Sequence, residues 1–187
     1  EDRINSEVEN KIGAEVFWKI DSSKQLNAAF NPDFGQVESD DVVVNFSATE
    51  TFYSDKRPFF SENHGLFNVT AWRFLYVINT RRIGGEPDYD CSKFGDMQED
   101  NCNNSKIGAN DIDYALRYSQ QGETLDFGFL GASEADENFS RGKDFYSVRL
   151  RTRKDDLTIG YLGTYVDRPV IDRTAQVNTM DFDYRPS

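Results

Sequence analysis

Alternating apolar and polar positions run through much of the chain and predict β-strands. Apolar residues occupy every second position in residues 14–20 and 26–30, and a polar turn at residues 21–24 separates them. This pattern predicts a β-hairpin. The same period of two appears in five later segments: residues 112–119, 125–129, 146–151, 157–165 and 180–184. Because successive side chains of a strand point to opposite faces, each segment has an apolar face and a polar face.

The connections between these later segments alternate in length. Tight polar turns follow Ser119 and Thr152, whereas longer loops follow Gly131 and Val166. The run at residues 66–78 is rich in Val, Thr and aromatic residues, which favours a further strand. With about nine strands in all, the sequence predicts an all-β fold, an antiparallel up-and-down meander with short turns at one end and long loops at the other.

Three stretches interrupt this pattern within what we expect to be one domain, residues 1–187. Residues 1–11 are highly charged and predict a frayed N-terminal segment. Residues 31–65 combine turn residues, charges and aromatic rings without a sustained period, which predicts a specified turn-like segment. Residues 86–110 are polar and rich in Asn and Gly, which predicts a long surface loop.

Two kinds of β-protein produce this alternation. In a soluble sandwich or small barrel the aromatic face packs inward, whereas in an outer-membrane β-barrel it meets lipid. The strand lengths, the tyrosines near strand ends and the mixture of Asp, Arg and Gly on the polar faces favour the membrane barrel. On this interpretation Tyr114, Leu116, Phe127 and Tyr161 face lipid. The lumen then receives Asp113, Arg117, Asp126, Arg149, Arg151, Asp181 and Asp183.

The overall charge limits the partners. The chain has 33 acidic and 21 basic residues, which give a net charge of −12. A nucleic-acid partner is not expected, because phosphate binding needs clustered Lys and Arg. No apolar run approaches the length of a transmembrane helix, but alternating membrane strands are compatible with the low mean hydropathy of −0.69. Nothing in the sequence predicts a cofactor.

Two cysteines, Cys91 and Cys102, lie close together in the polar region 86–110. They predict a disulfide, which suits an oxidising envelope compartment, with two free thiols as the alternative. His64 is the only histidine and sits in an Asn-His-Gly turn. Zinc binding is therefore not expected, because a zinc site needs further Cys or His ligands.

The central stretch concentrates acidic side chains after the Asn31-Pro32 turn. The closely spaced carboxylates are Asp33, Glu38, Asp40 and Asp41. They could bind Ca²⁺, although the spacing differs from that of an EF-hand loop, or form a solvated acidic turn capped by backbone N–H groups. We favour the solvated turn and predict no dedicated metal site.

Basic residues follow the acidic cluster. The group consists of Lys56, Arg57, Arg81 and Arg82. These residues could bind an anionic ligand, but we favour ion pairs with the acidic cluster and Glu62 inside a lumen. The segment would then form a partial plug, with Phe59 and Phe60 anchoring it by packing.

Catalysis receives little support from the sequence. Carboxylate pairs such as Glu38 with Glu50, or Asp40 with Glu62, could act in a glycosidase only if they face each other across a cleft. With one histidine, in a turn, no Ser-His-Asp or Cys-His set is credible. We therefore predict a non-enzymatic domain.

Three motifs resemble a known family. They are NPDFGQVESD at residues 31–40, KRPFFSEN at residues 56–63 and RRIGG at residues 81–85. Together they resemble an uncharacterised outer-membrane β-barrel family of Gram-negative bacteria, found C-terminal to a family-9-type carbohydrate-binding module. The resemblance implies that the chain is part of a larger barrel in the outer membrane.

The resemblance also sets the expected partners and function. It implies contact with outer-membrane lipid, and with glycans or other envelope proteins, in envelope transport or glycan handling. A soluble all-β domain that binds a carbohydrate or a metal is the alternative. A hydrolase acting on glycans is a weaker third hypothesis.

Overall fold

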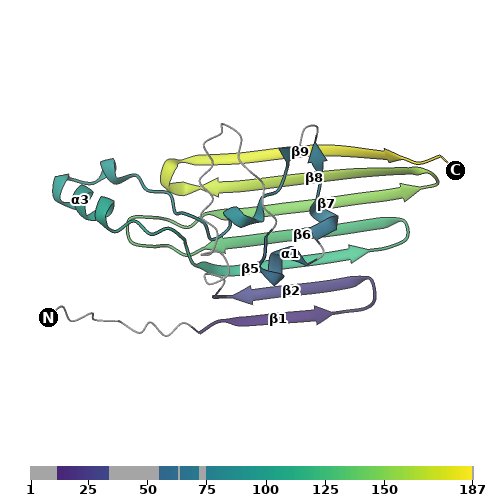
Figure 1. The fold of residues 1–187 in the computed structure, drawn as a ribbon, viewed down its shortest axis with the longest axis horizontal. Helices are drawn as coiled ribbons and strands as arrows, with labels where there is room; N and C mark the ends of the chain where they lie inside the picture. The colour runs from purple at the N-terminus through teal and green to yellow at the C-terminus, as the bar shows by residue number, and fades with distance from the viewer. Residues whose placement is uncertain (1–11, 34–54, 63, 72–74, 187) are drawn as a thin grey trace.

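The computed structural model describes residues 12–33, 55–62, 64–71 and 75–186. Its main element is a seven-stranded antiparallel sheet, drawn in Figure 1. The strands are β1 (Ala14–Lys19), β2 (Lys24–Phe30), β5 (Ile112–Gln121), β6 (Leu125–Glu134), β7 (Asp144–Lys154), β8 (Leu157–Arg168) and β9 (Arg173–Tyr184). They lie in this order across the sheet, which confirms the antiparallel meander. The sheet is not closed into a barrel: within the described residues, β1 and β9 form its open edges.

Tight turns join the strands at one end of the sheet. The turn between β7 and β8 places Asp155 at φ 51°, in the left-handed region that Asp tolerates better than most residues. At the opposite end, the predicted long loop after Val166 is wrong. The strand β8 continues to Arg168, and the 3₁₀-helix η3 (Pro169–Ile171) leads almost directly into β9. The first half of β9 lacks an alternating pattern because this edge strand is exposed on both faces.

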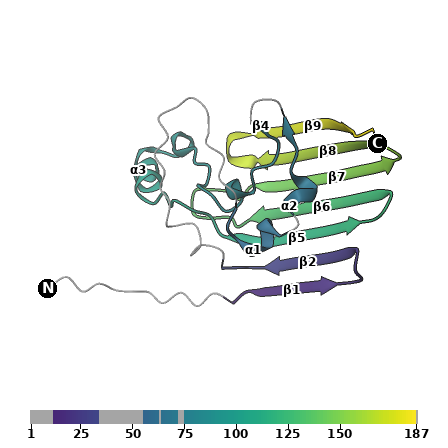
Figure 2. The same cartoon turned by 45° about the vertical axis from the view of Figure 1, so that its right-hand side comes forward.

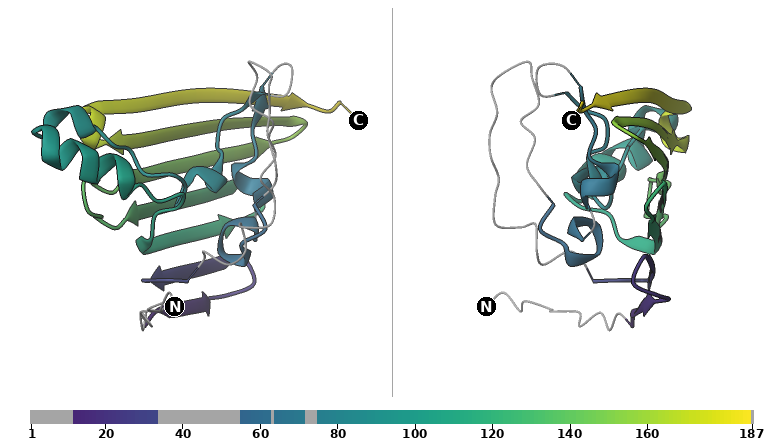
Figure 3. Two further views of the ribbon diagram at one scale, coloured as in Figure 1. Left: turned by 60° about the vertical axis from the view of Figure 1, so that its left-hand side comes forward. Right: turned by 90° about the vertical axis from the view of Figure 1, so that its right-hand side faces the viewer.

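Between β2 and β5 the chain forms an insert, by which we mean the described residues 55–62, 64–71 and 75–110. It contains the helices α1 (Pro58–Ser61), α2 (His64–Phe67) and α3 (Asp96–Asn104), the short strands β3 (Thr70–Ala71) and β4 (Leu75–Tyr76), and the 3₁₀-helices η1 (Thr80–Arg82) and η2 (Cys91–Lys93). Figures 2 and 3 show these elements on one side of the sheet. We call this side the inner face and the opposite side the outer face.

Two predictions within the insert need correction. The run at residues 66–78 does not form one long strand but contains the end of α2 and the two-residue strands β3 and β4. Its apolar residues Leu66, Phe67 and Val69 are buried under the sheet, so their grouping reflects packing rather than strand periodicity. Residues 86–110 are not entirely loop, because α3 occupies nine of them. That helix has almost no apolar side chains, which explains why no helical pattern was visible.

The apolar core lies between the insert and the inner face. From the insert come Phe59, Phe60, Leu66, Phe67, Val69 and Ile83, and from the sheet come Ala29, Ile112, Ala115, Leu130, Ala132 and Leu162. Close approach depends on Gly128 in β6. A Cβ atom there would lie 2.7 Å from Cζ of Phe67 and 2.9 Å from Cδ2 of Leu66, so a larger residue would push α2 away from the sheet.

The outer face is apolar and uncovered by the described residues. In Figure 3, right, the sheet is seen along its edge, and the described elements of the insert lie to one side of it. Large apolar side chains on the outer face are 36% to 70% exposed: Val16, Trp18, Phe30, Tyr114, Leu116, Leu125, Tyr146, Leu150, Leu157, Ile159, Tyr165, Met180, Phe182 and Tyr184.

Candidate functional site

The insert is organised around Arg57, whose side chain is buried. Its guanidinium donates to both carboxylate oxygens of Asp55, with Nη2–Oδ2 at 2.8 Å. It also donates to the carbonyl oxygens of Thr80 (2.8 Å) and Ile83 (2.7 Å). The ring of Phe60 lies 4.3 Å from the guanidinium carbon. Arg57 therefore joins the KRPFF segment to the RRIGG segment.

Asp55 is held in its charged form by this contact. Burial raises the pKa of the Asp55 carboxyl, but hydrogen bonds from Arg57 and its positive charge outweigh burial and lower that pKa below its ordinary value. A buried carboxylate in a bidentate contact with arginine is a strong and directional pair. The pair is therefore suited to fixing structure inside the insert.

A second arginine attaches the insert to the sheet. Arg117 of β5 donates through Nη1 to the carbonyl oxygens of Phe59, at 2.5 Å, and Glu62. Its Nη2 donates to the carboxylate of Glu62 at 2.8 Å. The same carboxylate accepts hydrogen bonds from Gln25 (3.0 Å) and Asn27 (3.1 Å) of β2. Glu62 is thus held by two neighbouring strands of the inner face.

A third arginine, Arg149 of β7, makes a similar attachment. Its Nε donates to the carbonyl oxygen of Leu66 at 3.1 Å, and its other nitrogens bind both oxygens of Asp181 in β9 at 2.5 and 2.9 Å. The pair spans β8 at Gly160, where a Cβ atom would lie 2.6 Å from the guanidinium. Glycine at this position leaves room for the ion pair.

Further ion pairs lie on the inner face near the end of the sheet that has the tight turns. Asp126 of β6 is fully buried and accepts from Arg151 at 2.7 Å and also from Arg153, both of β7. Arg153 also donates to the carbonyl oxygen of Gly122 at 3.0 Å. Asp113, predicted to belong to this polar row, instead falls at the register shift between Ile112 and Tyr114 and is exposed.

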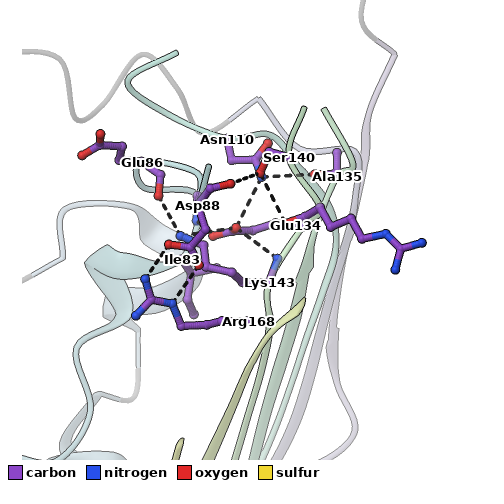
Figure 4. Close-up of polar contacts among 12 residues, drawn as sticks. Ile83, Glu86, Asp88, Asn110, Glu134, Ala135, Ser140, Lys143 and Arg168 are labelled. Atoms are coloured by element: carbon purple, nitrogen blue, oxygen red, sulfur yellow. Dashed lines mark hydrogen bonds and ion pairs between the residues drawn. The ribbon is translucent and has the colours of Figure 1, made fainter. Parts of the chain in front are cut away.

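At the opposite end of the sheet, Glu134 of β6 binds residues of the insert and so holds the insert on the sheet. Its Oε1 accepts from the N–H of Gly84 at 2.9 Å, and its Oε2 accepts from Nδ2 of Asn110 at 3.3 Å. Nζ of Lys143 lies 3.6 Å from the same carboxylate and donates to the carbonyl oxygen of Glu86 at 2.8 Å. Gly84 has a φ of 75°, which glycine adopts without strain. Figure 4 shows these contacts, which we call the latch.

The latch also contains the pair Asp88–Arg168. Nε of Arg168 donates to Oδ2 of Asp88 at 2.8 Å, and Nη2 binds the other carboxylate oxygen. The hydrogen bond from Arg168 lowers the pKa of the Asp88 carboxyl, which burial partly opposes and the charges of Arg168 and Lys143 reinforce. Ser140 donates to the carbonyl oxygen of Asp88 at 2.8 Å, so three parts of the chain meet here.

The disulfide prediction is confirmed. Cys91 and Cys102 are bonded, with Cα atoms 5.6 Å apart, and the bond links η2 to α3. Both residues are buried. Lys93 then donates to the carbonyl oxygen of Val170 at 3.1 Å, which connects this disulfide-linked part of the insert to η3.

The residues proposed from sequence fall into different environments. Arg57 and Glu62 lie in the contacts described above. Asp33 is exposed at the end of β2. Lys56 and Arg82 are exposed and Arg81 is half-buried, and none of them belongs to the Arg57–Asp55 pair. The other proposed acidic positions, Glu38, Asp40 and Asp41, lie outside the described residues.

The latch residues were not identified from sequence. Glu134 lies 50 positions from Gly84, and Arg168 lies 80 positions from Asp88. Each is one charged residue among many, so only the fold brings the partners together. A weak signal existed at Glu134, because it continues the buried-face alternation of β6 with a charged residue.

The arginine–carboxylate contacts described above hold the insert together and attach it to the sheet. The carboxylates of Asp55, Glu62, Asp126 and Asp181 are each occupied by arginine. Within the described ranges, no group of three or more His, Cys, Asp or Glu residues is placed to hold a metal ion. No helix in the described part of the chain is long and apolar enough to cross a membrane.

The fold and these contacts define a class: an open antiparallel meander that carries a polar-anchored insert on one face. A family model described as a domain of unknown function (DUF5916) matches residues 1–150, and the chain belongs to this family. The match covers all three sequence motifs and ends within β7. Comparison with curated proteins and with solved structures found no significant match.

Proposed function

We propose that this chain forms a sector of an outer-membrane β-barrel wall, with the insert as a plug on the luminal side. The observation that carries this proposal is the opposite chemistry of the two faces. The outer face is apolar and exposed, while the inner face holds buried ion pairs. Exposed apolar patches of this extent are characteristic of surfaces that meet a membrane or another protein.

The few charges on the outer face support a membrane-facing band. By the strand register, outer-face charges occur only near strand ends: Lys24 and Lys154 near the tight turns, and Asp144 and Asp167 near the long connections. The positions between them on β7 are Tyr146, Val148, Leu150 and Thr152. A lipid-facing strand has this distribution, because charges are tolerated at the membrane interfaces and costly at the middle.

The strand lengths fit the same band. β7 has 11 residues. At about 3.3 Å per residue it extends for about 36 Å, and a tilt of about 40° reduces this to about 28 Å along the membrane normal. The lipid-facing band of outer-membrane barrels is about 25 Å tall. Both ends of β7 would therefore reach the interfaces.

The proposed role is structural and gating rather than catalytic. Closure of a barrel requires further strands against the open edges β1 and β9, because unpaired backbone groups are not tolerated in the hydrocarbon region. The insert would occlude part of the lumen and, through the latch, control passage of solutes through the envelope. The family resemblance suggests glycans or other envelope proteins as partners.

A pair of arginine substitutions on β7 tests the membrane assignment. Leu150→Arg places a charge at mid-strand on the outer face, and Thr152→Arg places one nearer the end. In a bilayer we expect Leu150→Arg to cost about 2–4 kcal/mol of unfolding free energy and Thr152→Arg less, toward about 0–1 kcal/mol. The measurement is urea unfolding of the full chain in lipid vesicles.

The same two substitutions are expected to have small and similar effects on stability if the outer face meets water. Arginine at an exposed position in water changes stability by about 0.5 kcal/mol or less. Equal, small effects of the two substitutions, together with a monomeric folded protein in detergent-free buffer, would exclude the membrane-facing assignment of the outer face.

A further inference from the structure

A cavity lies between residues 76–83 of the insert and the inner face of the sheet. It has a volume of about 280 Å³ and separates the extended segment after β4, residues 77–79, from β6, β7 and β8. This volume is near the lower end of the range for small-molecule pockets. Since one water molecule occupies about 30 Å³ of liquid, the cavity holds about nine waters or one small organic molecule.

The walls of the cavity are mainly apolar. Leu130 and Phe145 come from the inner face of the sheet, together with Val166, and Val77 and Ile78 face them from the insert. Val77, Ile78 and Val166 are half-buried, so a molecule can reach the cavity from solvent. An apolar lining with a few polar groups is the usual composition of a site for a small molecule.

Hydrogen-bonding groups lie among these apolar walls. Ser147 and Thr164 are paired neighbours on β7 and β8 and both line the cavity. Ser147 donates to the carbonyl oxygen of Gly163, whereas the hydroxyl of Thr164 makes no hydrogen bond with the described residues. The main-chain groups of Val77 and Ile78 likewise make none with the described part of the chain.

The charge of the lining restricts the ligand. Among the described residues that line the cavity, Arg82 is the only charged one and none carries a carboxylate. A cationic ligand would therefore find no counter-ion among these described residues. A neutral or anionic oxygen-bearing group would find hydroxyl and N–H donors together with a guanidinium.

We propose that this cavity binds a small molecule with an aromatic or branched aliphatic body and one oxygen-bearing polar end, either a hydroxyl or a carboxylate. The body packs against Leu130, Phe145 and Val166, and the polar end meets Thr164, Arg82 and the free main-chain groups. The bound molecule braces the insert against the sheet, because it contacts both. The proposal rests on the packing of the insert and is independent of a membrane location.

Three probes of one size and different charge test the ligand class. They are benzyl alcohol, benzoate and benzylammonium, added to the full chain in a mild detergent. The readout is hydrogen exchange of the Val77 and Ile78 amides. At ten times its dissociation constant, a ligand that protects these amides slows their exchange about tenfold. We expect this slowing with benzoate and benzyl alcohol and none with benzylammonium.

Matched variants locate the effect. Thr164→Leu fills the cavity and is expected to abolish the slowing. Thr158→Leu makes the same change on the inner face of the same strand, outside the cavity lining, and is expected to retain it. Arg82→Gln is expected to raise the dissociation constant of benzoate about tenfold and to leave that of benzyl alcohol unchanged.

Thermal unfolding of each variant verifies that it is folded. Slowing by benzylammonium equal to that by benzoate would overturn the ligand class. Absence of slowing by benzoate and benzyl alcohol in the unmodified chain, or full slowing in Thr164→Leu, would overturn the site.

Discussion

Arg149 and Leu150 are neighbours in β7, yet they occupy opposite environments. Arg149 is buried beneath the insert and bound to Asp181 and Leu66, while Leu150 is 41% exposed on the outer face. The same inversion recurs along the sheet, where Arg117 and Asp126 are buried and Tyr114 and Leu116 are exposed. In water-soluble domains, charged residues are almost never buried without a partner, and large apolar residues gather inside.

The comparison of the two faces shows where the fold gains its specificity. The inner face fixes the insert through directional contacts, each with defined donors and acceptors. On the outer face the described hydrogen bonds join residues of the sheet to one another, such as Tyr161 and Asn178, and none of them holds the insert. The large side chains of this face are mainly apolar. A surface that recognises a solvent such as lipid needs uniform chemistry, whereas a surface that positions a particular segment needs individual contacts.

Replacement of Arg149 and of its neighbour Leu150 should give the largest difference in unfolding free energy between the inner and outer faces. Arg149→Met leaves Asp181 without its partner and the carbonyl of Leu66 without its donor. We expect a loss of about 3 kcal/mol, at the low end for a broken buried pair because Asp181 is one-third exposed. Leu150→Met, at the next position on the outer face, should cost less than about 1.5 kcal/mol. Equal losses in urea unfolding would contradict the assigned roles.

Alanine substitutions of one glycine on each face should give a smaller difference in unfolding free energy. Gly128→Ala puts a methyl group against Phe67 and Leu66 of the insert, and we expect a loss of about 1–3 kcal/mol from overpacking. Gly131→Ala points to the outer face, where the nearest atom is the ring end of Phe129 at 3.1 Å, and that ring can move. Hydrogen exchange of α2 should rise in the first variant and stay constant in the second.

Acidification should weaken the Asp88–Arg168 pair of the latch. Because the pKa of Asp88 is below its ordinary value of 3.8, the Asp88–Arg168 pair stabilises the fold above that value, and its contribution is lost as pH falls through the lowered pKa. We expect lower protection factors for the amides of residues 86 and 88–90 below about pH 4, each calculated against the intrinsic exchange rate at the same pH. Asp88→Asn should remove this pH dependence, and Asp100→Asn in α3 should preserve it. A pH dependence that persists in Asp88→Asn would assign it to another group.

The sheet was predictable because its strands obey a simple period. The segments around Tyr114, Phe127, Val148 and Tyr161 alternate cleanly, and the structure contains strands at each of them. The insert was less predictable, since its backbone is shaped by arginine contacts to single carbonyl oxygens. No local pattern reveals that Arg117 will bind the carbonyl of Phe59.

The candidate site was predictable only in part. The KRPFFSEN motif contains Arg57 and Glu62, and both take part in anchoring the insert. The predicted pairing of Arg57 with the acidic cluster stays a prediction, because Glu38, Asp40 and Asp41 lie outside the described residues. Within the described residues Arg57 pairs with Asp55, two positions away, which the sequence analysis did not single out. The latch depends on contacts between segments far apart in the chain, which composition and spacing do not encode.

The position of the insert in the chain has a consequence for folding. Most neighbouring strands are joined by hairpins, but β2 and β5 pair across residues 31–111. Closing that loop costs about 3 kcal/mol more in chain entropy than closing a three-residue turn such as the one between β5 and β6. The strands β5 to β9 can therefore assemble first, and β2 joins late. Until the insert docks, Arg117 and Arg149 lack their bonds to the carbonyl oxygens of Phe59, Glu62 and Leu66. Docking of the insert and pairing of β2 with β5 are therefore expected to form one slow, cooperative step.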